Sequence, residues 1–145
     1  MSENFHQEGG NYWKQLPAEF EGAKMLVDLQ GSIAHEPDWK LIADFEVFLL
    51  REGAALKLRV FEPLKGLAAQ TGWFAADELA TAYFDWLEVR LLYDASEWEV
   101  ISGISPVYEL QFSMESYGHA WVDTYGIWIA TFNKLALIGL RREQG

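Results

Sequence analysis

The sequence contains no cysteine among its 145 residues. Disulfide frameworks, thiolate metal sites and cysteine nucleophiles are therefore excluded, and the chain suits a reducing compartment. A secretory signal and a membrane span are also missing. Residues 1–10 have neither a basic start nor an apolar stretch, and the longest apolar run with a single glycine covers only residues 135–140. We expect a cytoplasmic protein.

Motifs of the common enzyme classes are absent as well. The chain has no G-x-G-x-x-G and no phosphate-binding loop, and its nearest approach to G-x-S-x-G, at residues 103–107, lacks the last glycine. Of the three histidines, His6 falls in a polar terminal segment, so an imidazole base would have to be His35 or His119. The sequence favours a binding protein over an enzyme and points to no cofactor.

Basic residues are scarce over a long part of the chain. The formal charge is -11, from 22 acids and 11 bases, and residues 66–133 hold ten of the acids but only one base, Arg90. Such a stretch cannot supply the phosphate contacts of a nucleic-acid-binding protein, and anionic lipids would repel it. The same charge would attract a basic protein surface and accelerate the association.

Length and composition indicate one domain with a core of its own. Half of the residues are hydrophobic, which is sufficient for a chain of this length to fold without a metal or disulfide. Residues 1–11 are polar and contain Gly9-Gly10, so we predict a flexible tail there and a single domain over residues 12–145.

The first half of the domain shows alternating apolar residues. Met25, Val27 and Leu29 suggest a first strand, and the clearest alternation runs over residues 39–49. A second alternating run follows Gly53 over residues 54–62 and stops at Pro63, which has no N–H for a ladder. These patterns predict a hairpin of two long strands.

The period changes over residues 74–86, where the apolar residues fall on one helical face and the acids on the other. This pattern predicts an amphipathic helix with Leu79 and Tyr83 toward the sheet and Phe84 among the acids. Residues 87–93 alternate again and favour a strand, although a helix continuing to residue 92 is an alternative.

Further strands are expected near residues 97–103 and 107–115, followed by an apolar region from residue 120 to residue 140 with a turn at Asn133-Lys134. Together the elements predict an α+β fold. It would be a mostly antiparallel, strongly curved sheet or partly closed barrel of about eight strands, with the helix packed on it. Gly10-Asn11-Tyr12-Trp13 resembles the glycine and tryptophan at the start of lipocalins, with one residue more between them. That resemblance implies a barrel that holds an apolar ligand.

Aromatic residues make up 15% of the chain, and a β-rich core accounts for most of them. Those that lie among acids, such as Trp73, Phe84 and Trp98, are candidates for exposed interface anchors. The predicted partner-binding residues are Asp77, Glu78, Phe84, Asp85, Glu88, Asp94, Glu97, Trp98 and Glu99.

A second candidate site is built around histidine. His119, Trp121 and Asp123 share one face of a strand, so that Asp123 could orient the imidazole or join it as a metal ligand. His35, Glu36 and Asp38 in a proline-containing turn could bind a cation, but turns favour acids for backbone reasons.

The first functional hypothesis is an acidic module that binds a basic protein, for example an immunity protein or inhibitor that occludes a toxin or nuclease. The alternatives are a lipocalin-like barrel for a small apolar ligand and a hydrolase or metal enzyme that uses His119.

Overall fold

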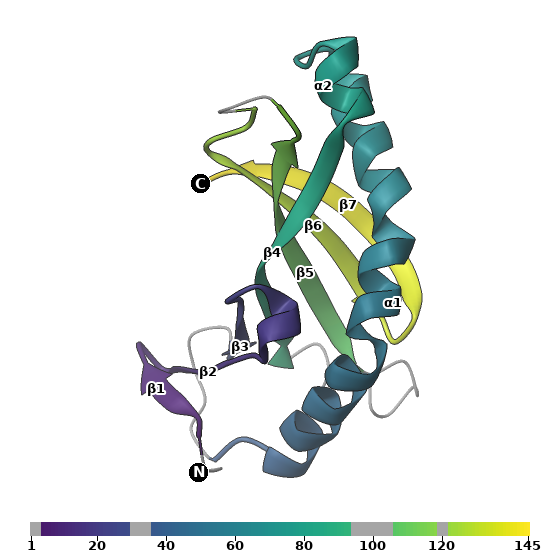
Figure 1. The fold of residues 1–145 in the computed structure, drawn as a ribbon. Helices are drawn as coiled ribbons and strands as arrows, with labels where there is room; N and C mark the ends of the chain where they lie inside the picture. The colour runs from purple at the N-terminus through teal and green to yellow at the C-terminus, as the bar shows by residue number, and fades with distance from the viewer. Residues whose placement is uncertain (1–3, 30–35, 94–105, 119–121) are drawn as a thin grey trace.

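The computed structural model describes residues 4–29, 36–93, 106–118 and 122–145 (Figure 1). These residues form an α+β fold in which one long helix lies on one face of a seven-stranded sheet. The strands are β1 (His6–Glu8), β2 (Asn11–Gln15), β3 (Lys24–Asp28), β4 (Ala82–Leu92), β5 (Val107–Ser116), β6 (Gly126–Asn133) and β7 (Ala136–Gln144). The helices are a 3-10 turn η1 (Ala18–Phe20), α1 (Trp39–Thr71) and the short α2 (Ala76–Ala80).

The strands lie in the sheet in the order of the chain. All neighbours are antiparallel except β3 and β4, which run parallel because α1 carries the chain back between them. Within the described residues β1 and β7 are the two edges, so the sheet is open. The prediction of a mostly antiparallel α+β fold is therefore confirmed in outline, whereas the partly closed barrel is not formed.

The predicted hairpin over residues 39–62 is wrong, because these residues belong to α1. Asp38 caps the start of the helix, and its carboxylate accepts hydrogen bonds from the backbone N–H groups of Lys40 and Leu41. Gly72, with a φ of 71°, caps its end. Pro63, taken as the end of a strand, lies inside it. Its buried residues recur every three or four positions: Ile42, Phe45, Leu49, Gly53, Leu56, Val60, Leu64 and Ala68.

The helix predicted over residues 74–86 is also wrong for most of these residues. Only α2 is helical there, and β4 begins at Ala82. Successive residues of a strand point to opposite faces, so Phe84 turns into the core, where it is 2% exposed, and Tyr83 turns outward. This reverses the expected orientation of both residues. The strand expected from residue 87 is the second half of β4, and the alternative of a helix to residue 92 is excluded.

Other strand predictions are confirmed. Met25, Val27 and Leu29 are buried along one side of β3 and its continuation, and β5 covers the expected residues 107–115. The turn between β6 and β7 lies at Lys134-Leu135, one residue beyond the expected Asn133-Lys134, and Lys134 takes a φ of 50°. The strand expected near residues 97–103 lies outside the described residues.

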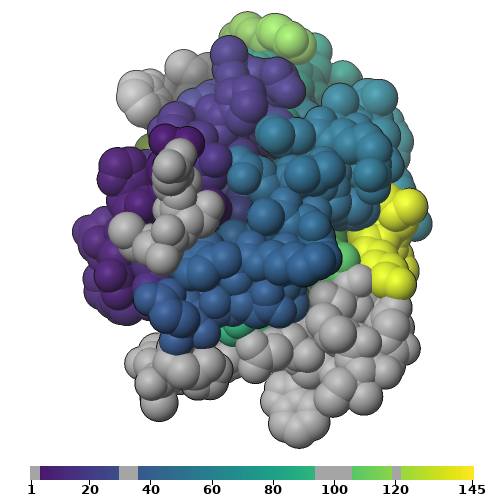
Figure 2. All heavy atoms as spheres, turned by 90° about the horizontal axis from the view of Figure 1, so that it is seen from below, coloured from purple at the N-terminus to yellow at the C-terminus, as the bar shows by residue number. Residues whose placement is uncertain are grey.

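The N-terminal segment packs against the beginning of α1, and Figure 2 shows the two side by side. Phe5 and Tyr12 contact the ring of Trp39, at 5.6 and 4.9 Å between ring centroids, and Lys14 forms an ion pair with Glu46 at 2.5 Å. Residues 6–8, inside the segment predicted to be a tail, pair with β2 as β1.

The core lies between α1 and the inner face of the sheet. Large aromatic side chains fill it, including Phe45, Tyr108, Phe112, Trp128 and Phe132, all at most 1% exposed. No helix in the described part of the chain is long and apolar enough to span a bilayer.

Candidate functional site

Two tyrosines stack on each other at one end of the outer face of the sheet. Tyr83 of β4 lies opposite Glu115 of β5, and its ring stacks on Tyr117 with 4.4 Å between centroids. Tyr117 is 70% exposed, and Asp85 follows along the same face of β4. The alternation of β4 thus places an aromatic pair and two acids, Asp85 and Glu115, together on this face.

A third acid, Glu21, reaches the same region from the turn after η1. Its backbone adopts a left-handed conformation with a φ of 57°. β3 pairs with β4 only from Glu88 onward, so the first half of β4 has no strand on that side among the described residues. The carboxylate of Glu21 takes that place, accepting a hydrogen bond from the Trp86 N–H at 2.8 Å and pairing with Lys57 of α1 at 3.1 Å.

We call Glu21, Tyr83, Asp85, Glu115 and Tyr117 together the Tyr83 surface. Partial burial, and then the negative charge of Glu21, raises the pKa of the Asp85 carboxyl, while Lys57 opposes the shift. Desolvation, and then the charges of Asp85 and Glu115, raises the pKa of the Tyr83 hydroxyl. Both shifts have the direction expected in a region of negative potential.

Hydrogen bonds hold the end of β5 against α2 beside this surface. The Tyr117 N–H donates to the carbonyl of Thr81 at 3.2 Å, and the Ser116 hydroxyl donates to the carbonyl of Glu78 at 2.8 Å. The carboxylate of Glu78 accepts a hydrogen bond from the Ala75 N–H at 2.7 Å, and Asp77 is exposed. The acids of α2 are thereby fixed next to the Tyr83 surface.

Of the predicted partner-binding residues, Asp85 belongs to the Tyr83 surface, and Asp77 and Glu78 lie next to it. Phe84 is buried, so the prediction that it is an exposed anchor is wrong. Glu88 pairs with Arg90 at 2.9 Å. Asp94, Glu97, Trp98 and Glu99 lie outside the described residues.

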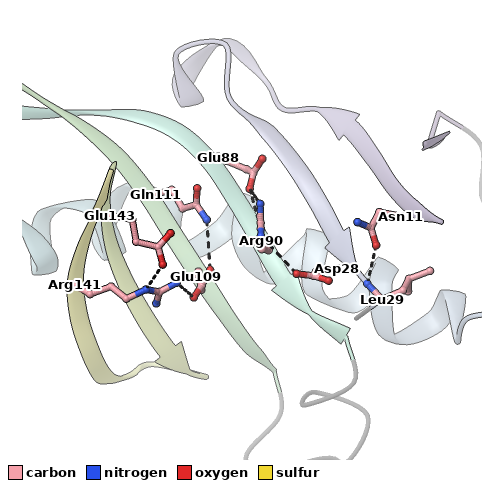
Figure 3. A network of polar contacts seen from close by, with 9 residues as sticks. All are labelled: Asn11, Asp28, Leu29, Glu88, Arg90, Glu109, Gln111, Arg141 and Glu143. Atoms are coloured by element: carbon pink, nitrogen blue, oxygen red, sulfur yellow. Dashed lines mark hydrogen bonds and ion pairs between the residues drawn. The ribbon is translucent and has the colours of Figure 1, made fainter. Parts of the chain in front are cut away.

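Farther along the outer face, the acids are neutralised by a network of ion pairs (Figure 3). Arg90 of β4 contacts Glu88 and also Asp28 of β3, the latter at 3.6 Å. Arg141 of β7 pairs with the buried Glu109 of β5 at 2.7 Å and with Glu143 at 2.8 Å. Strand pairing thus brings Arg141 from a distant part of the sequence to Glu109, and Arg90 to Asp28, so the negative charge of residues 66–133 does not cover the face evenly.

Asp123 is the one residue of the predicted His119 site that the structure describes, and its contacts do not support a catalytic or metal-binding role. Asp123 accepts two hydrogen bonds from Arg142, at 2.7 and 3.0 Å, and a third from the indole N–H of Trp128 at 2.6 Å. The guanidinium of Arg142 also lies over the ring of Trp73, 5.0 Å from its centroid, and Trp73 is 65% exposed. Asp123 therefore has a structural role, and residues 35, 119 and 121 lie outside the described residues.

Glu36 and Asp38 are likewise engaged, Glu36 with the indole of Trp39 and Asp38 as the cap of α1. Within the described ranges, no three His, Cys, Asp or Glu side chains are grouped so that they could hold a metal ion.

Sequence reasoning missed Glu21, Glu115 and Tyr117 and assigned Tyr83 to the core. The sequence did contain a signal that Tyr83 faces outward. Ala82, Phe84 and Trp86 alternate with Tyr83 and Asp85, as inward and outward residues alternate in a half-buried strand. No local signal links Glu21 to β4, because the two are brought together only by packing of the η1 turn.

Comparison with known proteins gave no match to a family model, to a curated protein or to a solved structure. The function is therefore argued from the surfaces of the molecule. Among them, the Tyr83 surface combines an exposed tyrosine, stacked on a half-buried one, with clustered negative charge.

Proposed function

We propose that this protein is a binding module for a basic protein partner and that the Tyr83 surface is part of its interface. The observation that carries the proposal is the Tyr83–Tyr117 stack, in which Tyr117 is 70% exposed and Tyr83 is half-buried. Three carboxylates border the stack, and one paired base, Lys57, lies beside it. Tyrosines of this kind are frequent anchors of protein interfaces.

An arginine or lysine of the partner matches this surface in two ways. Its side chain can lie over a tyrosine ring, which attracts cations, and its charge can pair with Asp85 or Glu115. Tyrosine side chains also lose little conformational freedom on binding, because they have only two rotatable bonds. The negative charge of the whole chain would accelerate the encounter with such a partner.

The finer hypothesis is an immunity protein or inhibitor. Toxins and nucleases that act on nucleic acid have cationic sites, and an acidic module of this size can occlude one. The alternative is a small apolar ligand held in a curved or closed sheet. The described strands form an open sheet, so a closed barrel does not support this alternative.

The proposal is tested by comparing two immobilised proteins as baits in an extract of the source cells. One is the wild type, and the other carries Asp85→Asn and Glu115→Gln, which remove the charges and keep the shapes of the side chains. We expect a basic protein that is retained by the wild type and lost from the double variant. A variant with Glu8→Gln and Glu36→Gln, two exposed acids in β1 and just before α1, controls for loss of net charge.

For the protein so identified, association should slow as salt shortens the Debye length below about 10 Å, its value at 0.1 M. The double variant should associate more slowly than the wild type at low salt and at a similar rate at high salt. A specific partner that is acidic, or one retained equally by the wild type and the double variant, would show that the Tyr83 surface is not the interface.

A further inference from the structure

An apolar stripe runs along the outer side of α1, away from the sheet. It consists of Val47, Leu50, Ala54 and Leu58, and the three large residues are 61%, 41% and 79% exposed. Their spacing of three, four and four residues keeps them on one side of the helix over about 16 Å. Figure 2 shows this part of α1 at the surface beside the N-terminal segment. Single exposed apolar residues are ordinary, but an aligned row of them is typical of a helix that packs against another helix.

The charge of α1 differs from that of the rest of the chain. The helix carries five basic and four acidic residues, whereas the remaining residues hold six bases and 18 acids. The helix by itself therefore has little net charge with which to attract a basic partner. Two copies of the protein, however, repel each other least when they meet through α1, because their acidic surfaces then stay apart.

We propose that a second copy of this chain covers the α1 stripe, with the two α1 helices antiparallel about a two-fold axis near residue 56. In this register Leu58 of each copy lies against Ala54 of the other, so that the larger side chain fills the space left by the smaller one. A two-fold interface uses the same surface of both copies, as this arrangement requires.

The charged residues beside the stripe agree with the same register. Arg51 and Glu62 lie on one flank of α1, and the antiparallel arrangement brings Arg51 of each copy next to Glu62 of the other. Both residues are exposed, and Arg51 contacts only its neighbour Glu52 as an ion pair among the described residues. Because the stripe is smaller than a standard interface, which buries about 800 Å² on each partner, we expect a weak, concentration-dependent dimer.

Sedimentation equilibrium of the purified protein from about 1 µM to about 1 mM tests whether the dimer forms. We expect a rise in average mass toward that of two chains, and a mass of one chain throughout would overturn the proposal.

Leu58→Asp should weaken the association by at least about tenfold, because each copy would bury a carboxylate against Ala54. Leu87→Asp is the matched control, since Leu87 is also an exposed leucine, 43% exposed, and lies on β4 of the sheet and not on the α1 stripe. It should leave the association unchanged, and equal effects of the two substitutions would assign the dimer to another surface.

Charge exchange tests the antiparallel register. Arg51→Glu and Glu62→Arg should each weaken self-association, because like charges then face each other across the two-fold axis. An equimolar mixture of these two variants should associate more strongly than either one alone, since both intermolecular pairs are restored. A mixture that is no stronger than its components would exclude this register.

The proposal is independent of the proposed function. Leu58→Asp should leave capture of the basic partner intact, whereas Asp85→Asn with Glu115→Gln should leave the dimer intact, so either proposal can fail alone.

Discussion

The two sides of β4 differ sharply in composition and surroundings, and α1 shows the same contrast. The inner side of β4 presents Phe84 and Trp86 to the core, where both are at most 4% exposed, and the outer side presents Tyr83 and Asp85 to the Tyr83 surface. On α1, Gly53 faces the core and Leu58 faces solvent. In both elements, exposed aromatic or aliphatic residues lie on the outer side, and the inner side supplies the core.

The largest expected difference is between two adjacent aromatics of β4. Phe84→Ala should lower the free energy of unfolding by about 3–5 kcal/mol, because Phe84 packs against Phe61 and Trp128 in the core. Tyr83→Ala should cost about 1 kcal/mol, because its ring is half-buried and stacks on the exposed Tyr117 outside the core. Chemical denaturation of both variants measures the difference. Equal losses would mean that the two sides of β4 are equally buried.

The two sides of α1 can be compared through glycines. A Cβ at Gly53 would lie 2.6 Å from the ring of Phe20, whereas a Cβ at Gly66 would contact nothing within 4 Å. We expect Gly53→Ala to destabilise the protein by about 1–3 kcal/mol through overpacking. Gly66→Ala should stabilise it by roughly 0.5–1 kcal/mol, because alanine favours the helix. Thermal unfolding of the pair gives the sign of each effect, and stabilisation by both substitutions would contradict the close packing of η1 on α1.

The smallest expected effect is the pH dependence of stability that comes from Asp85, on the outer side of β4. Desolvation and the neighbouring Glu21 raise the pKa of Asp85 in the folded protein above its value of about 3.8 in the unfolded chain. The folded state thus binds this proton more tightly, so Asp85 opposes folding when the pH is above its folded pKa, and this penalty disappears as the pH falls toward 3.8.

Asp85→Asn should therefore gain stability relative to the wild type at pH 7, by less than about 1 kcal/mol because solvent screens the charges. The gain should shrink on acidification. Denaturation curves recorded at neutral and acidic pH would contradict this account if the advantage of the variant grew as the pH fell.

The error over residues 39–62 has a physical origin. Phe45 and Leu49 are four residues apart, a spacing that suits one face of a helix as well as one face of a strand. Ala43 and Val47 are exposed on the outer side of α1, but they are apolar. Together with the buried Phe45 and Leu49 they place an apolar residue at every second position, which is the pattern of a strand. A local pattern that fits both periods is resolved only by the packing available to the chain.

The candidate site was only partly accessible from the sequence. The acids of residues 66–133 were visible as a composition, and Asp85 was among the predicted residues. The ion pair of Glu109 with Arg141 depends on strand pairing, and the position of Glu21 beside Asp85 depends on the η1 turn. Contacts between residues so far apart in sequence leave no periodic signal.

The sequence by itself determined β3, β5 and the β6–β7 hairpin, because alternating or wholly apolar segments bounded by turn residues can be buried in few other ways. It also determined the net negative charge and the absence of cysteine chemistry. The tertiary structure decided that residues 39–71 form a helix, since that helix connects the parallel neighbours β3 and β4 and covers the inner face of the sheet. It also decided which side of β4 is exposed, because the phase of a short amphipathic segment follows from whether it pairs as a strand or coils as a helix.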